Sequence, residues 1–138
     1  MKVLILFAVA LIATGTEGRI FSRCELAQEL SRQGFPRDLL DHWVCLVEAE
    51  SSRNTAAVGP PNSNGSRDYG LFQINNLYWC QNGAPGKDCN VSCEDLLTDD
   101  ITKASNCAKI VYNRHGFSAW YGWQNKCQSS RPDISGCF

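Results

Sequence analysis

Eight cysteines behind a secretory leader constrain the fold of this chain more than any other feature of its sequence. The chain opens with a basic Lys2, an apolar run from Val3 to Ile12, and small residues at Thr16 and Gly18, which is the pattern of a cleaved signal peptide. All the cysteines lie after Gly18, and their number is even. In an oxidising compartment this predicts a disulfide framework, although cysteine spacing alone leaves the pairing open.

We expect a signal peptide over residues 1–18 and one domain over residues 19–138, a length sufficient for a modest core. The leader is too short to favour a membrane span, and no later apolar run is long enough. The sequence therefore predicts a secreted, extracellular protein, which we expect to be a monomer. The net charge of −1, with no basic tail or stripe, argues against nucleic acid as a partner.

A zinc site is the alternative use of paired cysteines, and the spacing argues against it. The closest pair is Cys89 and Cys93, and only His42 and His115 are available to complete a ligand set. We expect neither a metal nor a cofactor.

The local patterns predict a largely helical chain with one small sheet. Ser22 and Glu25 have the spacing of a capping box at the start of the first helix. Apolar periodicity, capping residues and terminal glycines predict helices over residues 23–31, 37–51, about 99–115, and 118–127. This order indicates an α+β fold, with a helical part, a small antiparallel β-sheet and a cleft between them.

The second predicted helix carries one carboxyl on its apolar face. At about 100° per residue, Glu50 falls within the apolar stripe, whereas Glu48 falls on the polar face as an ordinary surface residue. A carboxyl on a core-facing position has its charged form disfavoured, so the pKa of Glu50 should rise. The alternative is a helix-end glutamate that reaches solvent because the last turn frays.

A predicted hairpin from Asn62 onward carries a second carboxyl. Asn64 and Gly65 form the residue pair favoured by a tight turn, and the aromatic and aliphatic residues that follow predict a strand containing Asp68. Asp is disfavoured inside a strand, and a carboxylate with amides and exposed aromatics on a small sheet makes a reasonable sugar-binding surface. The alternative is a solvated strand carboxylate. A cleft between the two parts would have Glu50 on one wall and Asp68 on the other.

Two carboxyls in unlike environments suit glycoside hydrolysis, which needs one protonated acid and one ionised carboxylate. Several stretches then resemble one family: RCELAQEL, CLVEAES, NGSRDYGLFQIN, YWC and AWYGW, together with the spacing of all eight cysteines. On these residues the chain resembles a c-type lysozyme, a family that also contains the α-lactalbumins, from Arg19 to Phe138.

The resemblance implies a lysozyme-like α+β fold and a muramidase. The implied enzyme is a retaining glycoside hydrolase that cuts the β-1,4 bond between N-acetylmuramic acid and N-acetylglucosamine in bacterial peptidoglycan, with chitooligosaccharides as further ligands. It implies Glu50 as general acid/base and Asp68 as nucleophile or electrostatic stabiliser. The implied sugar-binding residues are Gln73, Asn75, Tyr78, Trp79, Ala119 and Trp120, and the implied disulfides are Cys24–Cys137, Cys45–Cys127, Cys80–Cys93 and Cys89–Cys107.

Some residues depart from the family pattern. Tyr78 stands where a tryptophan is common, and the segment between Cys107 and Trp120 is shorter by one residue. Thr98, Lys103 and Ala104 stand where calcium-binding relatives carry their ligands, so the resemblance implies no calcium.

Two other functions remain open on the residues alone: a non-catalytic sugar-binding member of the same fold, and a disulfide-stabilised toxin or inhibitor. The presence of both carboxyls argues against each. The biological role, antibacterial defence or digestion of bacteria, stays open, as does glycosylation of the sequons at Asn64 and Asn90. The sequence pI near 6.1 predicts weak attraction to anionic walls at pH 7, and hence an activity maximum in mild acid.

Overall fold

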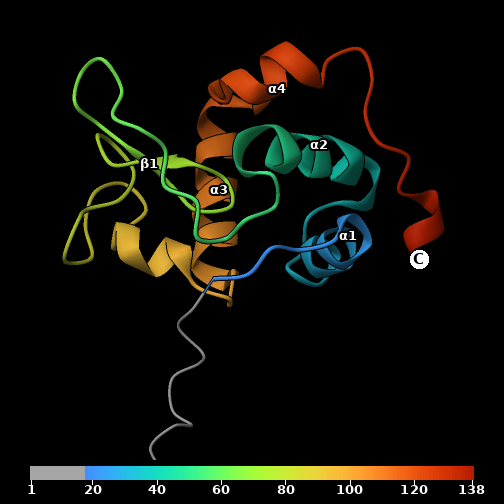
Figure 1. The fold of residues 1–138 in the computed structure, drawn as a ribbon, viewed down its shortest axis with the longest axis horizontal. Coiled ribbons are helices and arrows are strands. Elements are labelled where there is room, and N and C mark those ends of the chain that lie inside the picture. Colours follow the sequence, from blue (N-terminus) through green and yellow to red (C-terminus); the bar gives the residue numbers. More distant parts are fainter. Residues whose placement is uncertain (1–17) are drawn as a thin grey trace, which may run out of the picture.

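The computed structural model describes residues 18–138, so the predicted signal peptide lies outside the described residues except for Gly18. Figure 1 shows α2 (Leu40–Ser51) in the middle of a helical part, with α1 (Arg23–Arg32) below it, α4 (Tyr121–Lys126) above it and α3 (Thr102–His115) passing behind. The loops and the small sheet gather on one side. The α+β class predicted from the sequence is confirmed. Four short segments are 3-10 helices: η2 (Arg37–Leu39), η3 (Cys93–Leu97), η4 (Phe117–Ala119) and η5 (Ser135–Cys137).

The sheet belongs to the hairpin part, which we define as residues 58–97. It pairs β1 (Asp68–Tyr69) with β2 (Ile74–Asn75) in antiparallel register, so that Asp68 lies opposite Asn75. The continuous strand predicted from Arg67 is wrong, because the chain reverses between Gly70 and Gln73, both of which have positive φ. A Cβ at Gly70 would lie 2.2 Å from the carbonyl oxygen of Leu96, so only glycine fits this turn.

The predicted turn at Asn64 and Gly65 exists, but it lies in the loop before the sheet. The Gly65 N–H donates to the Asn62 carbonyl at 2.8 Å, and Gly65 has a φ of +87°. Asn64 does not have positive φ, so this is not the hairpin turn that would require it at both central residues.

The first two helices form as predicted. Ser22 and Glu25 make the complete capping box at the start of α1, and α1 ends just before Gly34, which has positive φ. The predicted 37–51 helix begins with the separate 3-10 turn η2 and becomes α-helical at Leu40. The apolar stripe of α2 is buried as the periodicity indicates: Leu40, Trp43, Val44, Leu46 and Val47 are all at most 2% exposed.

The last two helices differ from the predicted boundaries. α3 begins at Thr102 rather than near Asp99, and the Asp100 carboxylate accepts from the Thr102 N–H at 2.9 Å just outside the helix. The predicted helix over 118–127 is divided at Trp120, whose backbone is extended between η4 and α4. This break turns the indole inward, where Trp120 is 5% exposed and its Nε1 donates to the Phe72 carbonyl at 2.8 Å.

Four disulfides staple the fold, in the pairs that the resemblance implies. The helical part holds Cys24–Cys137, which joins α1 to η5, and Cys45–Cys127, which joins α2 to the end of α4. Cys80–Cys93 lies within the hairpin part, and Cys89–Cys107 ties that part to α3. The hairpin part has little regular structure of its own, so its disulfides substitute for the ladder hydrogen bonds of a larger sheet.

Candidate active site

A cleft of about 890 Å³ separates the helical part from the hairpin part. Both carboxyls selected from the sequence line it, and so do the six residues that the resemblance implies for sugar binding: Gln73, Asn75, Tyr78, Trp79, Ala119 and Trp120. Sequence positions from 49 to 122 contribute to the walls, so the cleft is a product of the whole fold.

Glu50 lies at the end of α2, on the helical wall. Burial raises the pKa of its carboxyl, the N–H of Gly122 partly opposes this, and the negative charge of Asp68 adds to the rise. The Gly122 N–H donates to Oε2 at 2.9 Å, at the start of α4. A Cβ on Gly122 would lie 2.8 Å from the same oxygen, so the bare glycine allows this close approach. The position of Glu50 on the apolar face of α2 therefore leaves its carboxyl largely desolvated, with one backbone N–H as its hydrogen-bond donor.

Asp68 lies on β1, on the opposite wall, and is held by side-chain amides. Asn75 Nδ2 donates to Oδ1 at 2.9 Å, and Asn62 Nδ2 donates to Oδ2 at 3.2 Å. Both amides also donate to the hydroxyl of the buried Ser66, which itself donates to Asn64 Oδ1 at 2.6 Å. Because an ionised carboxylate only accepts hydrogen bonds, two converging amide donors suit the charged form of Asp68.

The aromatic residues of the cleft divide into buried and exposed ones. Trp120 packs edge-on against Trp43, with ring centroids 5.6 Å apart, and is fixed by its bond to Phe72. Tyr78 is 64% exposed and Trp79 is partly buried, so both present ring surface to a ligand. Trp123 does not line the cleft; it stacks on Phe117, and its Nε1 donates to His42 Nδ1 at 3.2 Å.

Gln73 lines the cleft, but within residues 18–138 it makes no hydrogen bond to Asp68. Its amide donates to the carbonyls of Ala57 and Gly70, both at 3.1 Å, and so stabilises the turn between β1 and β2. Arg67, which is next to Asp68 in sequence, bonds instead to Gly59 and Asn76. Of these three residues that lie near Asp68 in sequence, only Asn75 hydrogen-bonds to its carboxylate.

The expectation that Glu48 is an ordinary surface residue is wrong. Its carboxylate pairs with Arg23 at 2.8 Å and with Arg53 at 3.3 Å, and its side chain is only 21% exposed. The pairing joins α1, α2 and the segment after α2, so replacing Glu48 would disturb packing as well as charge.

Sequence reasoning missed Asn62 and Gly122, which donate to the carboxyls, and Ser66, whose hydroxyl accepts from the amides that hold Asp68. Asn and Ser are ordinary loop residues, and a glycine in a short helix has no distinctive pattern, so nothing in the sequence singled them out. Within residues 18–138, no cluster of three or more His, Cys, Asp or Glu side chains has the arrangement of a metal site. No helix in that range is long and apolar enough to cross a membrane.

Comparisons with known proteins agree with this geometry. The C-type lysozyme/alpha-lactalbumin family matches residues 19–137. A protein named lysozyme from Bombyx mori is 60% identical, over 99% of this chain and 100% of its own length. A lysozyme from Galleria mellonella is 64% identical, over 86% of this chain and 100% of its own length. The crystal structure of a lysozyme from Litopenaeus vannamei matches with a TM-score of 0.74 and 40% identity, covering 81% of this chain and 90% of that one.

Proposed function

This chain belongs to the C-type lysozyme/alpha-lactalbumin family and is a muramidase, and we propose that it cuts its substrate by a retaining mechanism carried by Glu50 and Asp68. The bond cut is the β-1,4 link between N-acetylmuramic acid and N-acetylglucosamine in bacterial peptidoglycan. One observation carries the proposal: two carboxyls from different parts of the fold line one cleft in unlike surroundings. Lysozyme is itself the standard example of this division of roles between an acid and a carboxylate.

Glu50 acts first as the general acid. Its raised pKa keeps a proton on the carboxyl at a pH where most glutamates have lost theirs. That proton passes to the glycosidic oxygen as the bond between this oxygen and the anomeric carbon breaks. In the second step Glu50, now ionised, takes a proton from the water that attacks the anomeric carbon.

Asp68 meets the positive charge that develops on the sugar ring. Its carboxylate bonds to the anomeric carbon, or stabilises it electrostatically, until water replaces the enzyme. The amides of Asn62 and Asn75 orient the carboxylate, so little reorganisation is needed when charge develops. Tyr78, Trp79, Ala119 and Trp120 line the cleft that holds the sugars.

Glu50→Gln tests this proposal. The variant keeps the shape of the side chain but cannot donate a proton as an acid, so turnover on bacterial cells should fall by at least about a hundredfold. Chitooligosaccharide binding, measured by tryptophan fluorescence, should persist. Asp68→Asn should be severely impaired as well. The matched control is Glu29→Gln, because the Glu29 carboxylate bonds only to the nearby Arg32 and Gln33, so the change should leave turnover nearly unchanged. Lysis by Glu50→Gln at the rate of the unmodified enzyme defeats the assignment.

The same proposal includes secretion and a preference for mild acid. The leader pattern of residues 1–18 supports export, and the low pI means that net charge turns positive only below about pH 6. Attraction to anionic cell walls should then grow with acidity and fade with added salt. A pH–rate profile on whole cells at constant ionic strength should peak below pH 7, which favours a digestive role; a maximum at pH 7 or above contradicts it.

A further inference from the structure

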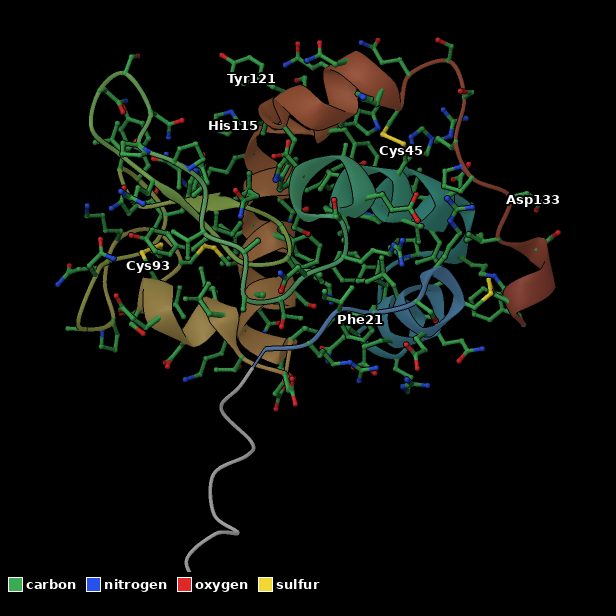
Figure 2. The ribbon with its side chains drawn as sticks, in the orientation of Figure 1. Phe21, Cys45, Cys93, His115, Tyr121 and Asp133 are labelled. Atoms are coloured by element: carbon green, nitrogen blue, oxygen red, sulfur yellow. A yellow bond between two sulfur atoms is a disulfide. The ribbon has the colours of Figure 1, made fainter. Side chains whose placement is uncertain are left out.

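The cleft contains one histidine that the two-carboxylate mechanism does not use. His115, the last residue of α3, is exposed and lines the cleft. Figure 2 labels it at the end of α3, close to Tyr121 at the start of α4. Among the described residues that line the cleft there is no lysine or arginine, so His115 is the one lining group in that set able to carry positive charge.

The position of His115 is held while its ring nitrogens stay available. Its ring meets Trp79 edge-on across the cleft, with centroids 5.8 Å apart. The guanidinium of Arg114 lies over the ring of the same tryptophan and pairs with Asp88, so both of its contacts are to the hairpin part. Within residues 18–138, the side chain of His115 makes no hydrogen bond; only its carbonyl accepts one, from Ser118. An exposed imidazole that contacts Trp79 and has both nitrogens free in a binding cleft is suited to contacting a ligand.

The two glycans that such a cleft accepts differ in charge. Chitooligosaccharides are neutral, whereas peptidoglycan carries carboxylates, on the lactyl ether of N-acetylmuramic acid where no peptide is attached and on the stem peptide where one is. Histidine is the side chain that ordinarily gains positive charge between pH 8 and pH 5. An imidazolium bonds to a carboxylate through a charge-assisted hydrogen bond, which neutral sugars cannot match.

We propose that His115 is a specificity-determining residue that binds a carboxylate of peptidoglycan and so favours this substrate over neutral chitooligosaccharides in mild acid. The inference rests on the proposed function and names the ligand group recognised by the same cleft. The charged and titratable groups around the imidazole are Arg114 and Asp88 beside it, and Tyr78, Tyr121, Glu50 and Asp68 along the walls of the cleft. Because Arg114 and Asp88 neutralise each other, an incoming carboxylate meets the imidazolium as the unpaired positive group.

The experiment measures selectivity as the ratio of kcat/KM on a carboxylate-bearing glycan to kcat/KM on chitohexaose, at pH 5 and pH 7 and constant ionic strength. A ratio cancels any general loss of folded enzyme. Two glycans distinguish the source of the carboxylate: peptide-free strands with free lactyl groups, and peptide-bearing strands. Each is also assayed after carbodiimide amidation, which removes the charge and leaves the sugars unchanged.

For the unmodified enzyme, the ratio should be about three- to tenfold higher at pH 5 than at pH 7, and amidation should remove that rise. His115→Gln should abolish the rise. His115→Lys should give the high ratio at both pH values, because its charge persists throughout this range. Lys126→Gln is the matched control: it removes one exposed charge in α4 outside the cleft and should keep the rise.

Three results would overturn the inference: an equal ratio at the two pH values in the unmodified enzyme, an unchanged rise in His115→Gln, or a loss in Lys126→Gln as large as that in His115→Gln. The last would assign the effect to net charge. Failure of the unmodified enzyme to hydrolyse any of these glycans would instead defeat the proposed function, so the two failures are distinguishable.

Discussion

The helical part and the hairpin part each present one carboxyl to the cleft, and they hold it by different means. Glu50 is positioned by the burial of α2 and by a single backbone donor from Gly122. Asp68 is positioned by a network of loop side chains, with Asn62 and Asn75 bonding to its two oxygens. The acid therefore depends on hydrophobic packing, which determines its pKa, and the carboxylate depends on directional hydrogen bonds, which determine its orientation.

The difference extends to the way the two parts are stabilised. The helical part contains the fully buried side chains of α1 and α2, whereas much of the segment from residue 76 to residue 90 is exposed and irregular. Loss of a contact in the packed core costs stability, because the surrounding side chains relax only partly. Loss of a bond in the loop network instead leaves the Asp68 carboxylate less well oriented. Apart from Glu50 itself, changes to the helical part should therefore mainly affect stability, and changes to the network around Asp68 should mainly affect catalysis.

Removal of single disulfides gives the largest expected effect on stability. Cys24–Cys137 closes a loop with a sequence separation of 113, and Cys80–Cys93 closes one of 13. In the chain-entropy model, replacing the first pair by serine should cost roughly 4–5 kcal/mol and replacing the second about 3 kcal/mol. Urea denaturation measures both. The comparison fails if the Cys24–Cys137 variant, measured where it is folded, loses more kcat than the Cys80–Cys93 variant.

Asn75→Ala tests the hairpin network directly. It removes the donor to Asp68 Oδ1 and the acceptor of the Leu77 N–H at 2.7 Å, so kcat should fall roughly tenfold while chitooligosaccharide still binds. Asn76→Ala is the matched control, since Asn76 bonds to Arg67 and Asn82 and does not line the cleft. Equal losses of kcat in the two variants would mean that the network contributes only to folding.

Glu50→Gln should give the smallest effect on stability, although its effect on turnover is large, and the sign of the stability change is informative. Because the pKa of Glu50 is raised in the folded state above its ordinary value of 4.5, the stability contributed by the protonated carboxyl is present below that value and is lost as pH rises through the folded pKa. The neutral variant should therefore melt higher than the unmodified protein at pH 7, by less than about 4 °C, and equally at pH 3.5. Calorimetry that finds the variant less stable at pH 7 contradicts the burial of Glu50.

Periodicity and capping predicted the helices well because those signals are local. The phase of α2 placed Glu50 near the core, and Ser22 with Glu25 marked the start of α1. The hairpin was predicted less well, because its turn depends on the close approach of Gly70 to Leu96, which are far apart in the sequence. The break in the helix at Trp120 was missed for the same reason. It allows the indole N–H to donate to the carbonyl of Phe72, which is distant in the sequence, so no local pattern predicts it.

For the candidate active site too, contacts between segments that are distant in the sequence were the ones not predicted. The family resemblance named residues that do line the cleft, but it did not indicate Asn62, Ser66 or Gly122, whose roles arise from contacts across the fold. Glu48 is an error of another kind. Its position on the polar face of α2 was predicted correctly, but its ion pairs with Arg23 and Arg53, which lie in other segments, were not predicted.

The bond between Cys24 and Cys137 also has a consequence for proteolysis. Every peptide link from residue 24 to residue 137 lies inside the ring that this bond closes. A protease that cuts once, for example in the exposed loop around Gly65, therefore opens the backbone without releasing a fragment. The two pieces stay covalently joined, with both carboxyl-bearing walls on one molecule.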